Sequence, residues 1–235
     1  MFLYRSQNTL IQMFRILHTS DLHIGKRLHQ EELKEDHRLF FNWLVDYIKH
    51  NDINALVVAG DVFDVANPSS EARRMYYDLL RELMLVKCKL IITGGNHDSP
   101  ATLEAPRELL KQLDIHVRGS YNADTNDFLI PIQDHKGETI LVVAAIPYLR
   151  DSDIRKYQSD ESYEDRNEAL KNGIAEVFRE ASQACKDLFP GIPAIAMGHL
   201  FIQGGSLSES EREIQIGNLA GLETNRLNDY FSYYA

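Results

Sequence analysis

The chain has 235 residues, of which 44% are hydrophobic and 26% are charged, and its formal net charge is -10. This size and composition fit one globular α/β domain, and the acidic balance excludes a protein that coats nucleic acid through a broad basic surface. Two cysteines without a CxxC spacing exclude a disulfide framework and a zinc ribbon, so we expect a reducing, cytoplasmic setting.

The first predicted strand follows an N-terminal extension. Residues 1–12 contain no continuous apolar core, so we expect a disordered leader and not a signal peptide. Residues 14–19 are predicted to form a strand, after which Asp21 and His23 follow two positions apart. In extended backbone this spacing points both side chains the same way. Taken alone, the pair is a weak indication of a metal site, and a capped loop is the plainer interpretation.

Residues 31–50 have a helical pattern, with an apolar face and aromatic neighbours. We interpret this stripe as core packing and not as a cofactor pocket. His29, His37 and His50 lie on or near this helix without a carboxylate partner at strand-end spacing, so we expect them to be solvated. The stripe consists of Phe40, Leu44, Tyr47 and Ile48, with Phe41, Val45 and Trp43 nearby.

The apolar run at residues 55–59 is also followed by an acidic residue, because Gly60 and Asp61 come directly after it. A helix N-cap is the plainer interpretation of Asp61. The next helix, however, is expected to begin near Pro68 and to run to about Lys87. Asp61 is therefore left without an evident structural role.

The third predicted strand is followed by the longest run of polar residues. Residues 89–93 are predicted to form a buried parallel strand that ends in two glycines, followed by Asn96, His97 and Asp98. Glycine allows close backbone approach, and open α/β sheets bind ligands at the carboxyl ends of their strands. The residues after this strand are therefore candidates for a functional site.

The rest of the chain has no repeat and no linker, so residues 13–235 are predicted to form one domain. Cys185 falls on the apolar face of a long helix as a packed thiol, and Gly198 and His199 end the last buried strand. In chain order we expect a helix at 99–113 despite Pro106, a strand at 115–117, a hairpin of 127–133 with 138–146, a helix at 160–188, a strand at 194–197, a polar loop at 204–212, and strands at 213–217 and 230–235.

These strand ends together predict a metal centre. Adjacent parallel strands end about 5 Å apart, so side chains that follow them should converge. Carboxylate, amide and imidazole donors without a thiolate suit manganese, iron or zinc, and two ions form a common clamp for phosphoester hydrolysis. Asp61 is the natural bridging carboxylate. The expected ligands are Asp21, His23, Asp61, Asn96 and His199.

The order of these motifs resembles the calcineurin-like metallophosphoesterases, whose pattern is DxH, GDxxD, GNHD or GNHE, and then GH. The resemblance implies a layered β-sandwich flanked by helices, and it implies the same five metal ligands. It also implies that His97 is the catalytic histidine, which contacts the phosphate and protonates the leaving oxygen, with Asp98 behind it as the partner that orients the ring.

Residues 18–26, 60–64 and 95–99 resemble, within that family, the nuclease subunits of bacterial complexes that repair double-strand ends. This likeness implies manganese-dependent exonuclease and endonuclease activity on DNA ends and hairpins. It also implies an SMC-like ATPase partner, and a homodimer through the helices that follow the second and third strands.

One departure from the family pattern concerns the C-terminus. The family continues with a Gly-His-x-His motif, whereas His199 is the last of the nine histidines here. We therefore expect a domain that is incomplete at its C-terminus and has weakened metal binding. Two alternatives stay open: a phosphoesterase for small substrates, which the acidic charge favours, and a catalytically silent scaffold or dimerisation fragment.

Overall fold

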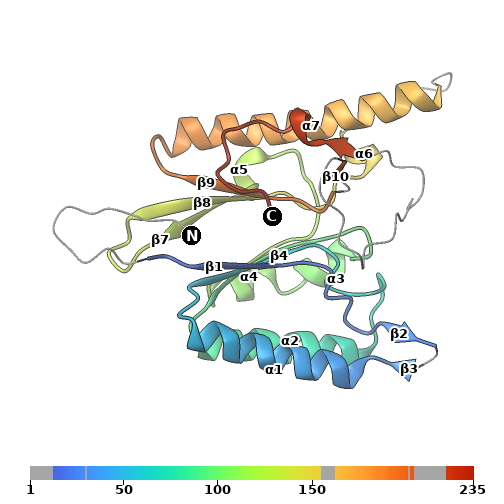
Figure 1. Ribbon diagram of the computed structural model, residues 1–235, viewed down its shortest axis with the longest axis vertical. Helices are drawn as coiled ribbons and strands as arrows, with labels where there is room; N and C mark the ends of the chain where they lie inside the picture. Colours follow the sequence, from blue (N-terminus) through green and yellow to red (C-terminus); the bar gives the residue numbers. More distant parts are fainter. Residues whose placement is uncertain (1–12, 30, 155–161, 201, 204–220) are drawn as a thin grey trace. The chain divides into compact units, whose positions relative to one another are not determined.

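The computed structural model describes residues 13–29, 31–154, 162–200, 202–203 and 221–235 (Figure 1). The chain divides into two compact units, Met1–Ser120 with Ala235 and Tyr121–Tyr234. Each unit has its own sheet and its own hydrophobic core. The expected leader at 1–12 lies outside the described residues, and the single domain over 13–235 stays a prediction.

The first unit is built on a parallel sheet in the strand order β1-β4-β5-β6. Thr19 pairs with Val58, and Ala59 pairs with Thr93, so the carboxyl ends of three strands lie at one edge. All four strands were expected from their apolar runs. They are β1 Ile16–Thr19, β4 Ala55–Ala59, β5 Lys89–Thr93 and β6 Ile115–Arg118.

Helices pack on this sheet through a buried apolar core, and Figure 1 shows α1 and α2 side by side on the same face. The Ser69 hydroxyl caps α2 by accepting a hydrogen bond from the Ala72 amide, several residues beyond Asp61, as the sequence predicts. The helices are α1 Lys34–His50, α2 Ser70–Leu85, α3 Pro100–Glu104 and α4 Arg107–Lys111.

The prediction for residues 31–50 was only partly correct. The helix begins at Lys34, because Glu31–Glu32 forms the short strand β3 that pairs with β2, Arg27–Leu28. The buried face of α1 carries Phe41, Leu44 and Ile48. The aromatic side chains assigned to the core lie instead on the exposed face, where neighbouring rings stack along the helix: Phe40, Trp43 and Tyr47.

The sequence predicted one helix over residues 99–113, whereas the structure has two short helices there. Pro106 separates α3 from α4, since proline has no amide hydrogen to bond the preceding turn. Leu103 on α3 and Leu110 on α4 are nevertheless both buried in the core of the first unit. The break therefore changes the path of the chain without losing the apolar face.

The second unit contains a sheet in the order β7-β8-β9, with β7 and β8 forming the predicted hairpin. The long helix α7 supplies Val177, Phe178 and Cys185 to its core, so the predicted packed thiol is confirmed. The elements are α5 Thr125–Phe128, β7 Leu129–Gln133, β8 Thr139–Ala145, α6 Asp151–Ile154, α7 Tyr163–Leu188, β9 Ala194–Met197, β10 Ile202–Gln203, β11 Leu222–Glu223 and the 3-10 turn Thr224–Arg226.

Two predictions for the C-terminal part need correction. Strand β9 belongs to the sheet of the second unit, so His199 does not follow a neighbour of β1, β4 and β5 as expected. Residues 230–235 do not form a full strand: Tyr234 makes an isolated bridge to Ala196. The loop at 204–212 and the strand at 213–217 lie outside the described residues.

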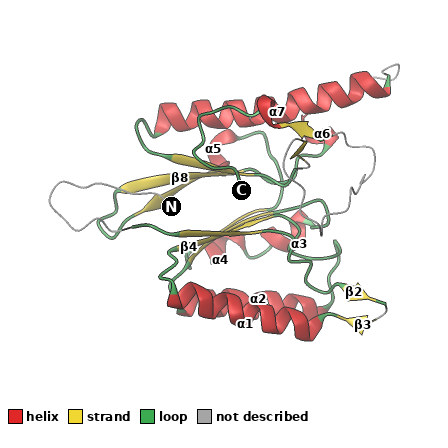
Figure 2. Cartoon of the chain, in the orientation of Figure 1, coloured by secondary structure: helices red, strands yellow, loops and turns green. Residues whose placement is uncertain are grey.

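Figure 2 shows helices and strands interspersed along the chain, which confirms the α/β class with helices flanking a parallel sheet. The layered sandwich concerns both units together and stays a prediction. Among the described helices, none has the length and apolarity required to cross a membrane.

Candidate metal centre

The loops after β1 and β4 are joined by backbone hydrogen bonds that continue the pairing of the two strands. The Asp21 amide donates to the Gly60 carbonyl at 3.1 Å, and the His23 amide donates to the Asp61 carbonyl at 2.9 Å. These bonds place the Asp-x-His segment directly along the Gly-Asp segment. The predicted convergence of Asp21, His23 and Asp61 is therefore produced by the backbone itself.

Three of the predicted ligands have left-handed backbone conformations. The φ angles are 54° at Asp21, 43° at His23 and 48° at Asp61. A positive φ is uncommon for residues with a side chain, although Asp and His tolerate it better than most. Such conformations persist where the surrounding structure enforces them, and they concentrate at functional sites. The strain thus marks the same three residues as the motif.

Asp61 is the buried centre of the site, with 3% of its surface exposed. Its Oδ1 atom accepts a hydrogen bond from the His97 amide at 3.0 Å, which links the loops after β4 and β5. Gly95 makes this approach possible, because a Cβ atom there would lie 2.1 Å from Asp61 Oδ1. The second glycine after β5 is therefore a steric requirement of the site.

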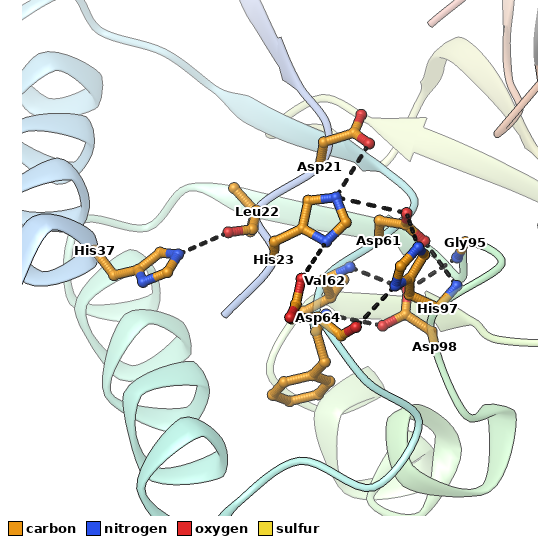
Figure 3. Close-up of polar contacts among 11 residues, drawn as sticks. Asp21, Leu22, His23, His37, Asp61, Val62, Asp64, Gly95, His97 and Asp98 are labelled. Carbon is orange, nitrogen blue, oxygen red and sulfur yellow. Dashed lines mark hydrogen bonds and ion pairs between the residues drawn. The ribbon is translucent and has the colours of Figure 1, made fainter. Parts of the chain in front are cut away.

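The imidazole of His23 faces two carboxylates (Figure 3). Its Nε2 atom lies 3.6 Å from Asp21 Oδ1 and 3.7 Å from Asp61 Oδ2. The Asp21 carboxylate raises the pKa of His23 above its usual value, partial burial opposes this, and Asp61 adds to the increase. The surroundings of the ring therefore favour positive charge, as expected of a site for a cation.

His97 lies across from His23, with the two rings in an edge-to-face arrangement at 5.1 Å between centroids. The Nδ1 atom of His97 lies 2.8 Å from the Asp64 carbonyl oxygen and must donate to it, so Nε2 is the nitrogen left for other partners. That Nε2 atom lies 3.9 Å from Asp61 Oδ2. The ring is partly exposed and accessible to a substrate.

Asp98 has a different function from the one expected. Its buried carboxylate accepts hydrogen bonds from the backbone amides of Val62, Phe63 and Gly95 at 2.9–3.0 Å. It therefore fastens the loop after β5 to the loop after β4, while a main-chain carbonyl orients His97. Burial raises the pKa of Asp98, and the three amide bonds oppose this increase.

The remaining predicted ligands are Asn96 and His199. Asn96 is exposed in the loop after β5, directly before His97. His199 is half-buried in the second unit, where its ring lies 6.3 Å from that of Tyr148. Their participation in a shared metal site stays a prediction.

Two residues that contact the site were not identified from the sequence. Asp64 contacts both histidines, and the only sequence signal was its place three residues after Asp61 in the GDxxD pattern. His37 was expected to be solvated, but its Nε2 atom lies 2.9 Å from the Leu22 carbonyl oxygen, between the two residues of the Asp-x-His pair. Helix α1 thus tethers that loop, which no local pattern indicated.

The donor atoms suit a divalent cation. Ligand atoms of His23, Asp61 and His97 all lie within 4.8 Å of one another. A buried carboxylate with imidazole nitrogens is a hard-to-borderline donor set, which fits manganese, iron or zinc. A cation among these carboxylates and imidazole rings would be attracted by the negative charge of the acids and ligated by the ring nitrogens.

The fold and this site define a class of protein. The chain belongs to the calcineurin-like phosphoesterase family, whose model matches residues 14–228. Proteins of this family bind divalent metals, and the clustered residues above are candidate ligands.

Within this family the chain is similar to the SbcD component of the SbcCD nuclease of several bacteria. It is 37% identical over 214 residues to that of Rhodobacter capsulatus, which covers 86% of this chain and 52% of the relative. It is 35% identical over 209 residues to that of Escherichia coli K12, covering 87% and 51%, and 30% identical over 205 residues to that of Bacillus subtilis, covering 86% and 51%. The chain spans about half the length of the curated relatives it matches.

Proposed function

We propose that this chain carries the nuclease site of an SbcD-type protein and hydrolyses phosphodiesters at DNA ends and hairpins with two divalent metal ions. Manganese is the ion that the resemblance to such nucleases favours. The observation that carries the proposal is the convergence of His23, Asp61 and His97 at the carboxyl edge of the first sheet, with His23 and Asp61 in left-handed backbone conformations.

The proposed ligands are Asp21, His23, Asp61, Asn96 and His199. When bound, the ions would polarise the phosphoryl oxygens and acidify a water molecule. Asp61 would hold an ion through Oδ2, which faces both imidazoles, while its Oδ1 is held by the His97 amide. Calorimetry with Mn²⁺ measures whether zero, one or two ions bind.

His97 is proposed as the general acid. Its Nδ1 hydrogen is committed to the Asp64 carbonyl, so the proton that it delivers to the leaving oxygen resides on Nε2. The Nδ1 bond restrains rotation of the ring, and the amide bond to Asp61 holds the backbone that carries it. A hydrogen on Nε2 can contact the phosphate before it is transferred to the leaving oxygen.

A His97→Gln variant tests this assignment. Cleavage of blunt duplexes and hairpins in Mn²⁺ should fall by about 100-fold or more, the usual contribution of a general acid. His50→Gln, which changes an exposed ring on α1, is the matched control and should cleave normally. If the wild-type chain hydrolyses small phosphodiesters and leaves DNA intact, the small-substrate alternative replaces the nuclease.

The proposed partners are an SbcC-type SMC-like ATPase, double-stranded DNA and a second copy of the chain, acting in the cytoplasm. The helices expected to form the homodimer are α2 and the α3–α4 segment, which expose Tyr77, Met84 and Leu109. Leu109→Glu should therefore convert a dimer to a monomer in sedimentation equilibrium. Leu188→Glu on α7, which is also exposed, should leave the mass unchanged.

A further inference from the structure

Asp64 has polar groups that contact both of the loops flanking its own. Its backbone amide donates to the Ile24 carbonyl at 3.3 Å, just beyond the Asp-x-His pair. Its backbone carbonyl oxygen accepts from His97 Nδ1 at 2.8 Å. Its carboxylate Oδ1 lies 3.2 Å from His23 Nδ1. Figure 3 shows Asp64 between the two imidazoles.

The contact with His23 is the one that the metal site needs. The Nδ1 atom of His23 is buried and makes no well-aligned hydrogen bond within the described residues, while the Asp64 carboxylate is within bonding distance. A hydrogen on Nδ1 leaves the lone pair on Nε2, and Nε2 is the atom that faces Asp21 and Asp61.

We infer that Asp64 is a positioning residue that sets the tautomer of both histidines, that of His23 through its carboxylate and that of His97 through its main-chain carbonyl. The inference rests on the proposed function in one respect, because it assumes that His23 ligates a metal ion. The contacts of Asp64 with the two rings do not depend on that assumption. A carboxylate behind a ligating imidazole fixes the ring and raises its basicity, and loss of such a partner commonly weakens metal binding 10–100-fold.

Substitutions at residue 64 separate the two effects, because a side-chain change leaves the carbonyl in place. At a pH at which both rings are neutral, ¹⁵N imidazole spectra of metal-free Asp64→Ala should show His23 leaving the Nδ1–H form while His97 keeps it. Calorimetry should show Mn²⁺ binding weakened on the order of 10–100-fold. Asp64→Asn retains an acceptor oxygen, so it should restore the His23 tautomer and most of the affinity.

A matched control is Asp114→Ala, which removes the carboxylate of another Asp–His pair, 3.5 Å from His116 Nε2. It should leave the spectra of His23 and His97 and the Mn²⁺ affinity unchanged. The inference is overturned if neutral His23 of the wild type carries its hydrogen on Nε2, a result that requires no variant. It is also overturned if Asp64→Ala and Asp64→Asn have the same Mn²⁺ affinity and the same His23 tautomer.

These readouts do not depend on DNA cleavage. A chain with the expected tautomers and Mn²⁺ affinities that cleaves no DNA would keep the inference and lose the nuclease proposal. An active nuclease in which neutral His23 carries its hydrogen on Nε2 would keep the nuclease proposal and overturn the inference.

Discussion

At the scale of single residues, the site depends on close contacts between loops that leave almost no free space. Asp61 packs directly against Gly95. The Asp98 carboxylate links the loops that carry them by accepting hydrogen bonds from backbone amides of both loops. The sequence patterns identified which residues matter, but the contacts among them are made by main-chain atoms. A substitution here should therefore act through the backbone as much as through lost ligand atoms.

Gly95→Ala should disable the site without touching a ligand. The added Cβ would lie 2.1 Å from Asp61 Oδ1 and 2.3 Å from the Asp61 amide nitrogen, so the loops must separate. We expect loss of Mn²⁺ binding in calorimetry and a destabilisation of roughly 1–3 kcal/mol from overpacking. Gly137→Ala, at a turn with φ of 80° and open space, should keep Mn²⁺ binding. Equal binding by both variants would contradict this account.

Asp114 should contribute acid-sensitive stability to the first unit. Its hydrogen bond with His116, supported by Lys89, lowers the pKa of Asp114 to about 2. The pKa is lower in the folded state, so the stabilisation is complete above the unfolded value of about 3.9 and is lost as the pH falls toward 2.

Asp114→Asn tests this pH dependence. Because the carboxylate is half exposed, we expect a loss of only about 1 kcal/mol at pH 7. Urea unfolding of the variant and the wild type should converge between pH 4 and pH 2. A difference that persists unchanged at pH 2 would contradict the assignment.

At the scale of elements, helix α1 shows how little a periodic pattern says about which face is buried. Its sequence carries apolar or aromatic residues on more than one face, and the pattern alone assigned Phe40 and Tyr47 to the core. Packing against the sheet instead buries Phe41, Leu44 and Ile48. The choice is made by the position of the neighbouring strands, which no window of α1 contains.

Adjacent residues of α1 provide a matched test. Leu44 is 2% exposed and Trp43 is 56% exposed. Leu44→Ala should lower the free energy of unfolding by about 2–5 kcal/mol, the usual cost of a core truncation. Trp43→Ala should cost less than about 1 kcal/mol despite removing the larger side chain. Denaturant titrations of both variants measure this, and a reversed order would place the core on the other face.

At the scale of the whole molecule, each unit keeps one thiol inside its core. Cys88 belongs to the core of the first unit and Cys185 to that of the second. Burial raises the pKa of Cys88 to about 12 and that of Cys185 to about 11. Both thiols are therefore protonated at neutral pH and inert as nucleophiles.

The two thiols should report the unfolding of each unit separately. In native protein at pH 8 we expect neither to react with a disulfide reagent within minutes, and both to react in strong denaturant. Single variants Cys88→Ala and Cys185→Ala identify which thiol reacts at each denaturant concentration. Rapid modification of the native chain at either position would contradict the burial that the structure shows.

The sequence by itself determined the α/β class, the parallel strands β1, β4 and β5, and the polar side chains that follow them. Apolar runs, glycines and polar strand ends are local, so they can be recognised in one short window. Only the tertiary structure decided that β9 with His199 belongs to another sheet, that Asp98 fastens loops, and that Asp64 contacts both imidazoles. Those outcomes depend on hydrogen bonds to main-chain groups brought together by packing, and a main-chain group is the same at every position of a sequence.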